Sequence, residues 1–160
     1  MARAKDETVT TDKSPDEGIR SAITVCRLRG AQVTPLREAV LTALWRAEGP
    51  IGAYELRGHL SETLGRTISA TSIYRSLEFL CDQGVAARIE SRNAYVACTH
   101  PEHEHTCIHF VCNACGSSSE IEDRRLERLL AADAKDIGFA IDHRVIELSG
   151  SCAECQRAPA

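Results

Sequence analysis

The chain has 160 residues, of which 43% are hydrophobic and only 4% are Phe, Trp or Tyr. This length suits one compact unit or two small ones, and so few aromatic residues favour a fold that a bound metal helps to hold together. No stretch approaches the roughly 18 apolar residues of a membrane span, and the polar N-terminus has no signal-peptide core. We therefore expect a cytoplasmic protein with no membrane partner.

The net charge of −4 is unevenly distributed along the chain. Residues 20–88 contain nine Arg and six acidic residues, whereas residues 89–160 contain seven basic and twelve acidic residues. A basic first half followed by an acidic second half is compatible with a DNA-facing unit joined to a different domain. Taken alone, this small excess of positive charge is weak evidence for DNA binding.

The spacing of apolar residues predicts four helices in the first half. Residues 1–17 have no periodicity and predict a mobile arm. The first helix is expected from Ile19 to Gly30, and the second starts at Thr34-Pro35, an N-cap with Pro in the first helical position. The third is expected to end at Gly65 and the fourth at Gly84.

The third and fourth predicted helices are typical of a helix-turn-helix. The fourth opens with the sequence SATSIYRS, whose hydroxyl groups can hold phosphates while Arg75 reaches a guanine edge in the major groove. Many short helix pairs share this pattern, and a solvated Arg75 is the alternative. Residues 85–98 alternate around a polar SRN turn and predict a two-stranded wing.

The second half predicts a small β-α-β unit. A strand is expected from His109 to Cys112, a helix over 122–137, and strands at 139–141 and 143–148. The apolar residues of the helix that we expect to face inward are Leu126, Leu129 and Leu130. Since this unit is too small for a core of its own, we expect oligomerisation through its sheet.

Cysteine and histidine are concentrated between Cys98 and Cys115, which hold four of the eight Cys and four of the six His. Two Cys-x-x-Cys pairs stand 37 positions apart. Four thiolates are the ligand set of a closed structural zinc site, and in a reducing compartment this interpretation is favoured over disulfides. The predicted zinc ligands are Cys112, Cys115, Cys152 and Cys155.

Several motifs occur in one order: VTPLREAVL, ISATSIYRSLEFL, CNACG and the second Cys pair. This order resembles the ferric uptake regulator superfamily over about residues 19 to 155, and IGAYEL, ESRNAYVAC and HRVIELSGSC resemble its zinc uptake regulator branch. The resemblance implies an α+β protein with a winged-helix DNA-binding domain over 18–90 and a zinc-binding α/β dimerisation domain over 91–160. It implies a homodimeric repressor of zinc uptake genes that binds a double-stranded DNA operator when zinc is bound, without enzymatic activity or a small-molecule substrate.

The resemblance also implies a second, regulatory zinc site near the hinge. The matching residues are Cys98, His105 and Glu120, whereas the family's wing histidine falls on Ala87, so a fourth ligand must come from elsewhere. We expect His103 in this role, because residues two apart in an extended segment point to the same side. The alternatives for this ligand are His100, Cys107 and His109, and His143 matches a further site of the superfamily.

For DNA, the resemblance implies base reading by Tyr54 and Arg75, with Tyr74 and Arg37 near the backbone. Three other hypotheses compete with this function. An iron- or peroxide-responsive regulator of the same superfamily would use Cys107 and His109. A zinc hydrolase or deaminase would use Glu120 as its general base, although the sequence lacks His-x-Glu followed by Pro-Cys-x-x-Cys, and a metal-storage module would leave Tyr54 and Arg75 without a role.

Overall fold

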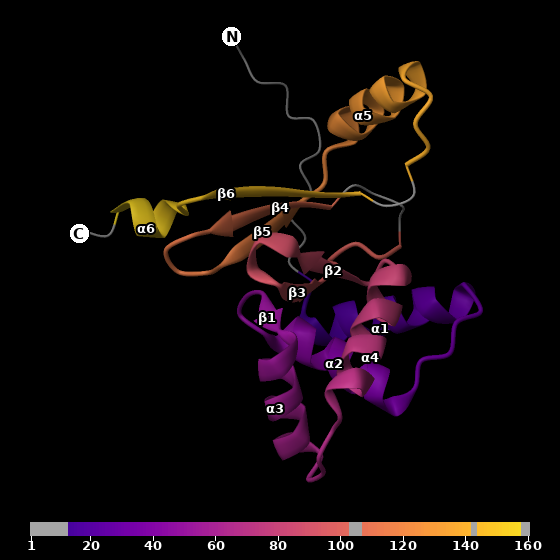
Figure 1. The fold of residues 1–160 in the computed structure, drawn as a ribbon, viewed down its shortest axis with the longest axis vertical. Coiled ribbons are helices and arrows are strands. Elements are labelled where there is room, and N and C mark those ends of the chain that lie inside the picture. The colour runs from indigo at the N-terminus through magenta and orange to yellow at the C-terminus, as the bar shows by residue number, and fades with distance from the viewer. Residues whose placement is uncertain (1–12, 103–106, 142–143, 158–160) are drawn as a thin grey trace.

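A computed structural model describes residues 13–102, 107–141 and 144–157. Its helices and strands form two units, shown in Figure 1. The first is a helical unit with the small sheet β1-β3-β2, and the second is built on the sheet β5-β4-β6. The predicted α+β architecture is confirmed. Within the described residues, no helix is long and apolar enough to cross a membrane.

Helix α1, Pro15–Leu28, begins earlier than predicted. Ser14 accepts a hydrogen bond from the Glu17 backbone, and the Glu17 carboxylate accepts one from the Ser14 backbone, which forms a capping box. The prediction of an arm over residues 1–17 was therefore wrong for residues 15–17, which are helical. The apolar spacing could not reveal this first turn because the capping groups that start it are polar.

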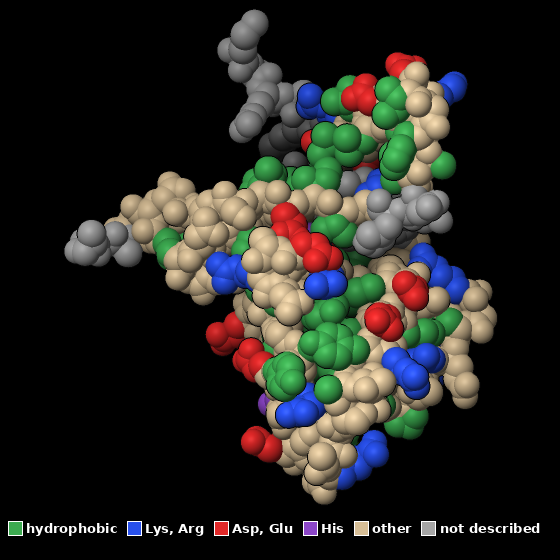
Figure 2. Space-filling model, viewed as in Figure 1, with side chains coloured by type: hydrophobic (Ala, Val, Ile, Leu, Met, Phe, Trp, Pro, Cys, Tyr) green, Lys and Arg blue, Asp and Glu red, His purple; other side chains and the backbone are tan. Residues whose placement is uncertain are grey.

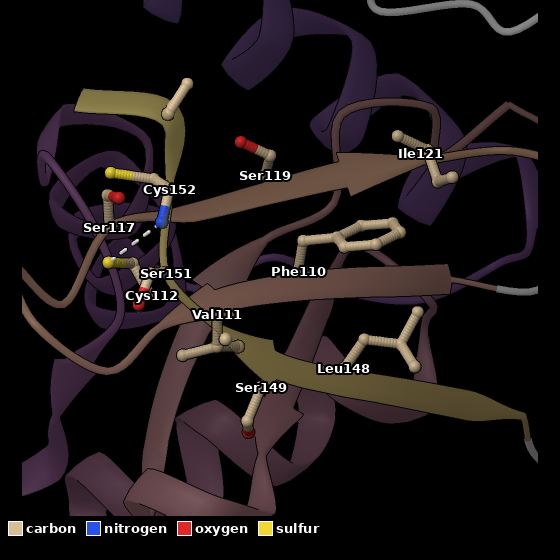
Figure 3. Close-up of a pocket in the computed structure, with 12 residues that line it drawn as sticks. Phe110, Val111, Cys112, Ser117, Ser119, Ile121, Leu148, Ser149, Ser151 and Cys152 are labelled. Carbon is tan, nitrogen blue, oxygen red and sulfur yellow. Dashed lines mark hydrogen bonds between the residues drawn. The ribbon is translucent and has the colours of Figure 1, made fainter. Parts of the chain in front are cut away.

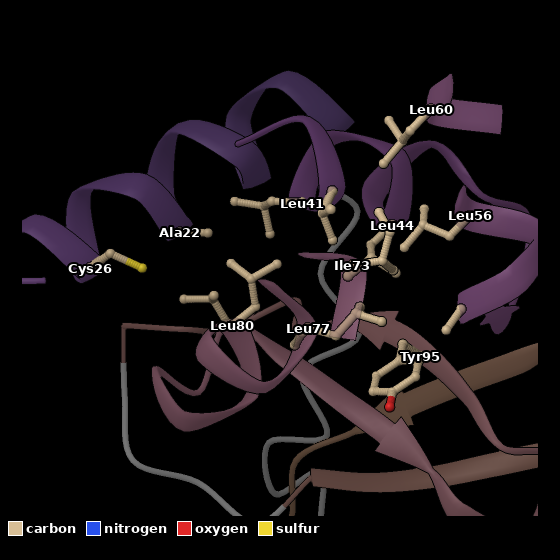
Figure 4. Close-up of a cluster of buried hydrophobic side chains, with 14 of the residues drawn as sticks. Ala22, Cys26, Leu41, Leu44, Leu56, Leu60, Ile73, Leu77, Leu80 and Tyr95 are labelled. Atoms are coloured by element: carbon tan, nitrogen blue, oxygen red, sulfur yellow. The ribbon is translucent and has the colours of Figure 1, made fainter. Parts of the chain in front are cut away.

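The next three helices form a compact core with α1. They are α2 (Pro35–Arg46, capped by Thr34), α3 (Ala53–Thr63) and α4 (Ala70–Asp82, capped by Ser69). Figure 4 shows side chains from these helices converging with Tyr95 of the adjacent sheet. Burial of this apolar surface is the main force that holds the helices in place. The fully buried side chains here include Cys26, Leu41, Leu56, Ile73, Leu77 and Leu80.

The predicted wing is present as β2 (Ala86–Ile89) and β3 (Ala94–Ala97). They are joined by the short 3-10 turn η1, Glu90–Arg92, after which Asn93 adopts a left-handed conformation with φ of 48°. A two-residue strand, β1 (Ile51–Gly52), pairs with β3 and was not predicted, because two residues carry no periodicity. This pairing fixes the start of α3 against the wing.

The second unit centres on β4, Cys107–Cys112. Strand β5 (Ser118–Ile121) pairs with it antiparallel, and β6 (Val145–Gly150) pairs with it in parallel. Helix α5 (Arg124–Asp136) connects β5 to β6, and a short helix α6 (Ala153–Arg157) follows. Strand β5 and helix α6 were not predicted, because SSEI is mostly polar and α6 has only five residues.

Two predictions for this unit were wrong. Residues 139–141 lie outside any strand, and Leu129 of α5 is 58% exposed rather than directed inward. Figure 1 shows α5 standing away from the sheet, on the side opposite the helical unit. Among the described residues, its exposed apolar side chains, such as Leu129, are therefore not covered by another element.

The two units meet where the wing packs on the central strand of the second sheet. Ala87, Ile89 and Val96 of the wing form a buried cluster with Val111 of β4. Figure 1 shows strands β2 and β3 between the helices and the sheet β5-β4-β6. The wing is thus a structural link between the helical unit and the cysteine-rich unit.

Candidate metal centres and nucleic-acid interface

Cys112, Cys115, Cys152 and Cys155 come together as one group, here called the four-cysteine cluster. Their four sulfur atoms all lie within 4.8 Å of one another. The first pair begins at the last residue of β4 and the second follows β6, so the parallel pairing that ends at Cys112 and Gly150 brings the two pairs together. This placement follows from the strand register and agrees with the spacing argument.

The dimensions of the four-cysteine cluster suit a tetrahedral zinc ion. The sulfur atoms of Cys115 and Cys152 are 3.8 Å apart. A tetrahedron with metal–sulfur distances of about 2.3 Å has edges of about 3.8 Å. The Cys152 N–H also donates to the Cys112 sulfur over 3.3 Å, as drawn in Figure 3.

The thiols of the four-cysteine cluster perturb one another strongly. Backbone N–H groups of Cys115 and Cys152 lower the pKa of Cys112 to about 5. The surrounding sulfurs of Cys152, Cys115 and Cys112 raise the pKa of Cys155 to about 12. Four thiolates at this distance repel one another, so the full set of ligands ionises together only around a cation. The donor set and its electrostatics therefore fit Zn²⁺.

A second group of possible ligands lies where the wing ends. Cys98, which follows β3, is only 1% exposed, and its sulfur lies 3.7 Å from Glu120 of β5. Thr99 holds the other oxygen of the Glu120 carboxylate through its backbone N–H and its hydroxyl, each at 3.0 Å. We call Cys98, Thr99 and Glu120 the hinge site. A soft sulfur and a fixed carboxylate oxygen can serve together as metal ligands.

The structure thus brings together two of the four residues predicted for the regulatory metal, Cys98 and Glu120. The other two, His103 and His105, lie outside the described residues, as do His143 and the side chain of Cys107. Thr99 was not predicted, because its role depends on a contact between segments 21 positions apart. The one sequence signal for Thr99 is that its hydroxyl group directly follows the predicted ligand Cys98.

Two histidines that we considered as alternative ligands are buried. The Nδ1 atom of His100 lies 2.9 Å from the Thr99 hydroxyl, which places His100 beside the hinge site. His109 is 1% exposed on β4, and its Nε2 atom is buried without a hydrogen-bond partner among the described residues. Its cross-strand neighbours are Glu120 on β5 and Glu147 on β6, so the three side chains lie on one face of the sheet.

The predicted DNA-reading residues lie on α3 and α4. Tyr54, in the first turn of α3, is 70% exposed and has the Arg57 guanidinium 5.0 Å from its ring centre. Arg75 is exposed on α4, whereas Tyr74 is half-buried against the helical core. The N-terminus of α4 is capped by the Ser69 hydroxyl, which accepts from the Ser72 N–H. The arrangement suits a recognition helix with an exposed Arg.

Arg37 makes contacts that the sequence did not reveal. Its guanidinium stacks over the Phe79 ring at 3.5 Å and donates to the Gln32 carbonyl over 2.7 Å. These contacts join α2 to α4 and orient the guanidinium. The assignment of Arg37 to the DNA backbone stays a prediction.

The outer face of the sheet β5-β4-β6 is apolar and open. Figure 3 shows Phe110, Leu148 and Ile121 side by side on it, with Cys112 and Cys152 toward the opposite end. They line a hollow of about 600 Å³ that ends at Cys112 and Cys152. In Figure 2, hydrophobic side chains also gather over α5. A surface of this kind marks an interaction site.

A comparison with known protein families identifies the family to which the chain belongs. The Ferric uptake regulator family matches residues 28–149, which run from the end of α1 into the last strand, β6. The chain belongs to this family.

Curated members of the family include clear relatives of this chain. The chain is 36% identical over 140 residues to the zinc uptake regulation protein of Escherichia coli strain K12, covering 87% of this chain and 81% of the relative. It is 31% identical over 130 residues to the zinc uptake regulation protein of Mycobacterium tuberculosis strain H37Rv, covering 79% and 96%.

Solved structures of family members agree with the fold. A zinc uptake regulator complexed with zinc and DNA matches with a TM-score of 0.81 at 34% identity, covering 91% of this chain and 97% of that one. Holo XcZur matches with a TM-score of 0.78 at 36% identity, covering 88% and 97%, and apo XcZur with 0.52 at 35% identity, covering 89% and 98%. The structure of the whole chain is thus more similar to the holo form than to the apo form of that family member.

Proposed function

We propose that this protein is a zinc-responsive transcriptional repressor that binds a double-stranded DNA operator as a homodimer and controls zinc uptake genes. The observation that carries the proposal is the hinge site, where Cys98 at the end of the wing meets Glu120 of the second sheet. Ligands from the two units can link metal binding to the orientation of the recognition helix. The matches to zinc uptake regulators support this function. Acting on operator DNA, the protein works in the cytoplasm.

The two metal sites have different roles in this proposal. Zinc in the four-cysteine cluster is structural, because it joins the ends of β4 and β6 in a unit with little core of its own. Regulatory zinc is held by Cys98 and Glu120 together with His105 and His103. Bound there, the ion would supply a positive charge that offsets the thiolate and the carboxylate.

DNA reading is assigned to the exposed surface of α3 and α4. Arg75 reads a guanine edge, Tyr54 contacts a base, and Tyr74 and Arg37 lie near the phosphates. The exposure of Arg75 and Tyr54 supports the base contacts. Tyr74 is half-buried in the helical core and Arg37 is stacked on Phe79, so both side chains also help to hold α2 and α4 in position.

The homodimer forms through the apolar sheet face and α5. Phe110, Leu148 and Leu129 are all substantially exposed in the single chain. Covering them with a second copy removes apolar surface from water and completes the core that this unit lacks. The two recognition helices are then presented to two half-sites of an operator.

The main rival is an iron- or peroxide-responsive regulator, which would bind its metal through Cys107 and His109. The buried Cys98 thiol beside Glu120 favours zinc, because a thiolate ligand selects Zn²⁺ over Mn²⁺ and Mg²⁺ and also over Fe²⁺. A regulator is also favoured over an enzyme, since Thr99 holds the Glu120 carboxylate with two hydrogen bonds and the matched relatives are uptake regulation proteins.

The test is DNA affinity measured against free metal. A duplex is selected from a random-sequence pool by the zinc-loaded protein, and binding is followed by fluorescence anisotropy in buffered free Zn²⁺ and, separately, anaerobic Fe²⁺. We expect tight binding at low free Zn²⁺, loss of binding in chelator, and no binding at matched Fe²⁺. Activation by Fe²⁺ at a lower free concentration than Zn²⁺ would support the rival, and binding that ignores chelator would contradict a metal-responsive repressor.

A further inference from the structure

The turn at the tip of the wing, η1, is attached to the second sheet. The Glu147 carboxylate of β6 accepts hydrogen bonds from the backbone N–H groups of Glu90 and Ser91, the latter over 3.2 Å. Two N–H donors on one carboxylate form a strong, directional contact. Its partners in the wing are these two backbone groups and the Ser91 side chain, so the contact depends on the shape of the turn, on Ser91 and on Glu147.

The same turn makes a second contact with this sheet. Arg92 Nη2 donates to the Cys112 carbonyl over 2.6 Å, which ties the wing to the first residue of the four-cysteine cluster. We call these two contacts, Glu147 with the η1 backbone and Arg92 with the Cys112 carbonyl, the wing latch. They flank the buried apolar contact between the wing and Val111. The interface thus combines an apolar centre with two polar anchors.

The wing latch lies on the same face of the sheet as the hinge site. Across β5, β4 and β6, the residues Glu120, His109 and Glu147 occupy one row. Burial raises the pKa of Glu147, but the hydrogen bonds from Ser91 and Glu90 and the nearby His109 outweigh burial, and its pKa lies below the usual range. Glu147 is therefore a carboxylate at neutral pH, as the wing latch requires.

We propose that the wing latch positions the recognition helix for operator binding, and that the tip of the wing serves as a domain anchor rather than as a DNA contact. The inference rests on the proposed function and extends it to residues that hold no metal. Helix α4 leads directly into the wing, with only three residues between Asp82 and Ala86. Fixing the wing on the second sheet therefore also fixes α4 relative to the dimerisation surface.

The structural comparison is compatible with this role. Two forms of XcZur, at nearly equal identity to this chain, match it with TM-scores of 0.78 and 0.52. The two forms therefore differ in their overall similarity to this chain. A contact that stabilises one arrangement of the two units more than another shifts the population toward that arrangement. If DNA binds this arrangement, the contact raises DNA affinity by at most the difference between its free energies in the two arrangements.

For Glu147, electrostatics and the wing latch predict opposite changes in DNA affinity. Removing the Glu147 carboxylate removes a negative charge, which by electrostatics alone would strengthen binding to DNA. The wing latch predicts the opposite, because the recognition helices lose their fixed orientation. For Arg92, loss of a phosphate contact would lower the salt dependence of binding by about one unit of slope, whereas loss of the wing latch leaves that slope unchanged.

The experiment uses the full-length zinc-loaded dimer and the duplex selected by the wild-type protein. Glu147→Ala, Arg92→Ala and the double variant are compared at saturating zinc over a range of salt concentrations. The matched control is Arg88→Ala, because Arg88 is in the same wing but pairs only with Glu90 and Asn93 among the contacts described. Zinc content and dimer mass are measured for every variant.

We expect Glu147→Ala and Arg92→Ala each to weaken DNA binding by roughly 10-fold, with zinc content, dimer mass and salt slope unchanged. The double variant should lose less than the product of the two single effects, because both residues hold the same turn. Arg88→Ala should bind within about twofold of wild type. If Glu147→Ala loses zinc or the dimer, Glu147→Gln replaces it in the test, because Gln keeps the side-chain volume and one acceptor oxygen. Glu147→Gln should weaken DNA binding by a smaller factor than Glu147→Ala.

Equal or tighter DNA binding by Glu147→Ala, or by Glu147→Gln where that variant decides, would overturn the wing latch. A reduced salt slope shared by Arg92→Ala and Arg88→Ala would also overturn it, because the wing would then contact phosphates. These outcomes leave the proposed function standing. Failure of the wild-type protein to select any duplex in zinc would instead contradict the proposed function itself.

Discussion

Gly18 is a poor helix former that lies within helix α1 because the packing of a neighbouring ring leaves no room for a larger side chain. It lies in the first half of α1, where a Cβ atom would be 2.2 Å from the Trp45 ring. Gly58 lies in α3 with open space around its Cα. Alanine is the better helix former at both positions, so only packing distinguishes them.

The two glycines therefore predict opposite effects of the same substitution. Gly58→Ala should stabilise the protein by about 0.5 to 1 kcal/mol, because Gly loses more backbone entropy on folding. Gly18→Ala should destabilise it by about 1 to 3 kcal/mol, because the Trp45 ring must move. Thermal unfolding of the zinc-loaded variants measures both, and a rise in melting temperature for Gly18→Ala would show that Trp45 moves without cost.

Arg75 is the residue on which sequence-specific DNA reading depends. Arg75→Ala should weaken binding by about 1 to 3 kcal/mol per half-site and relax preference at one base pair, because a bidentate contact to guanine is lost. Zinc content should not change, since Arg75 lies on α4, outside both candidate metal sites. Binding to single-base variants of the selected duplex measures the effect, with Arg20→Ala at an exposed position of α1 as the charge-matched control. Equal affinity of Arg75→Ala and Arg20→Ala would remove Arg75 from the recognition surface.

At the scale of elements, α5 and the outer face of the sheet β5-β4-β6 both expose large apolar side chains in the single chain. Leu129→Asp should shift the zinc-loaded protein from dimer toward monomer, because it places a charge within the proposed apolar interface. Leu28→Asp is the matched control, since Leu28 is 82% exposed on α1, outside that surface. Sedimentation velocity distinguishes the two species. A dimer that survives Leu129→Asp but not Leu28→Asp would place the interface on the helical unit.

The helices and the wing could be predicted from sequence, because their signals are local. Thr34-Pro35 and Ser69 mark helix starts, and apolar spacing marks the buried faces of α2 to α4. Strand β5 was missed because its residues are mostly polar and it forms only by pairing with β4. Leu129 was misplaced because periodicity identifies an apolar face of a helix but not the molecule that covers it.

The candidate sites divide in the same way. The four-cysteine cluster follows from two short-range pairs and one strand register, so spacing alone indicated it. Cys98 and Glu120 were paired through resemblance, and the structure brings them to 3.7 Å. Thr99 and the wing latch depend on contacts between distant segments, for which the sequence has no local signal.

At the scale of the whole molecule, the four-cysteine cluster and the hinge site separate stability from sensing. Cys155→Ser should remove about one zinc per chain and unfold or dissociate the second unit, because zinc binding supplies folding free energy to a unit this small. Zinc content by mass spectrometry and dimer mass by light scattering measure this. A Cys155→Ser variant that stays dimeric with its full zinc content would contradict the structural role of the cluster.

Cys98→Ser should have a different outcome, because Cys98 lies outside both Cys-x-x-Cys pairs and beside Glu120. The variant should keep the structural zinc, the dimer and its melting temperature in chelator, yet require at least about 10 to 100 times more free zinc to bind DNA, as for loss of a group that supports a metal. Glu120→Ala and His105→Ala should behave alike, whereas His59→Ala, at an exposed position of α3, should not. Cys81→Ser, which changes a half-buried thiol of α4, is the matched control for the thiol itself. If Cys98→Ser binds DNA at wild-type free zinc, the regulatory metal does not use the hinge site, and Cys107 with His109 on β4 becomes the pair to substitute next.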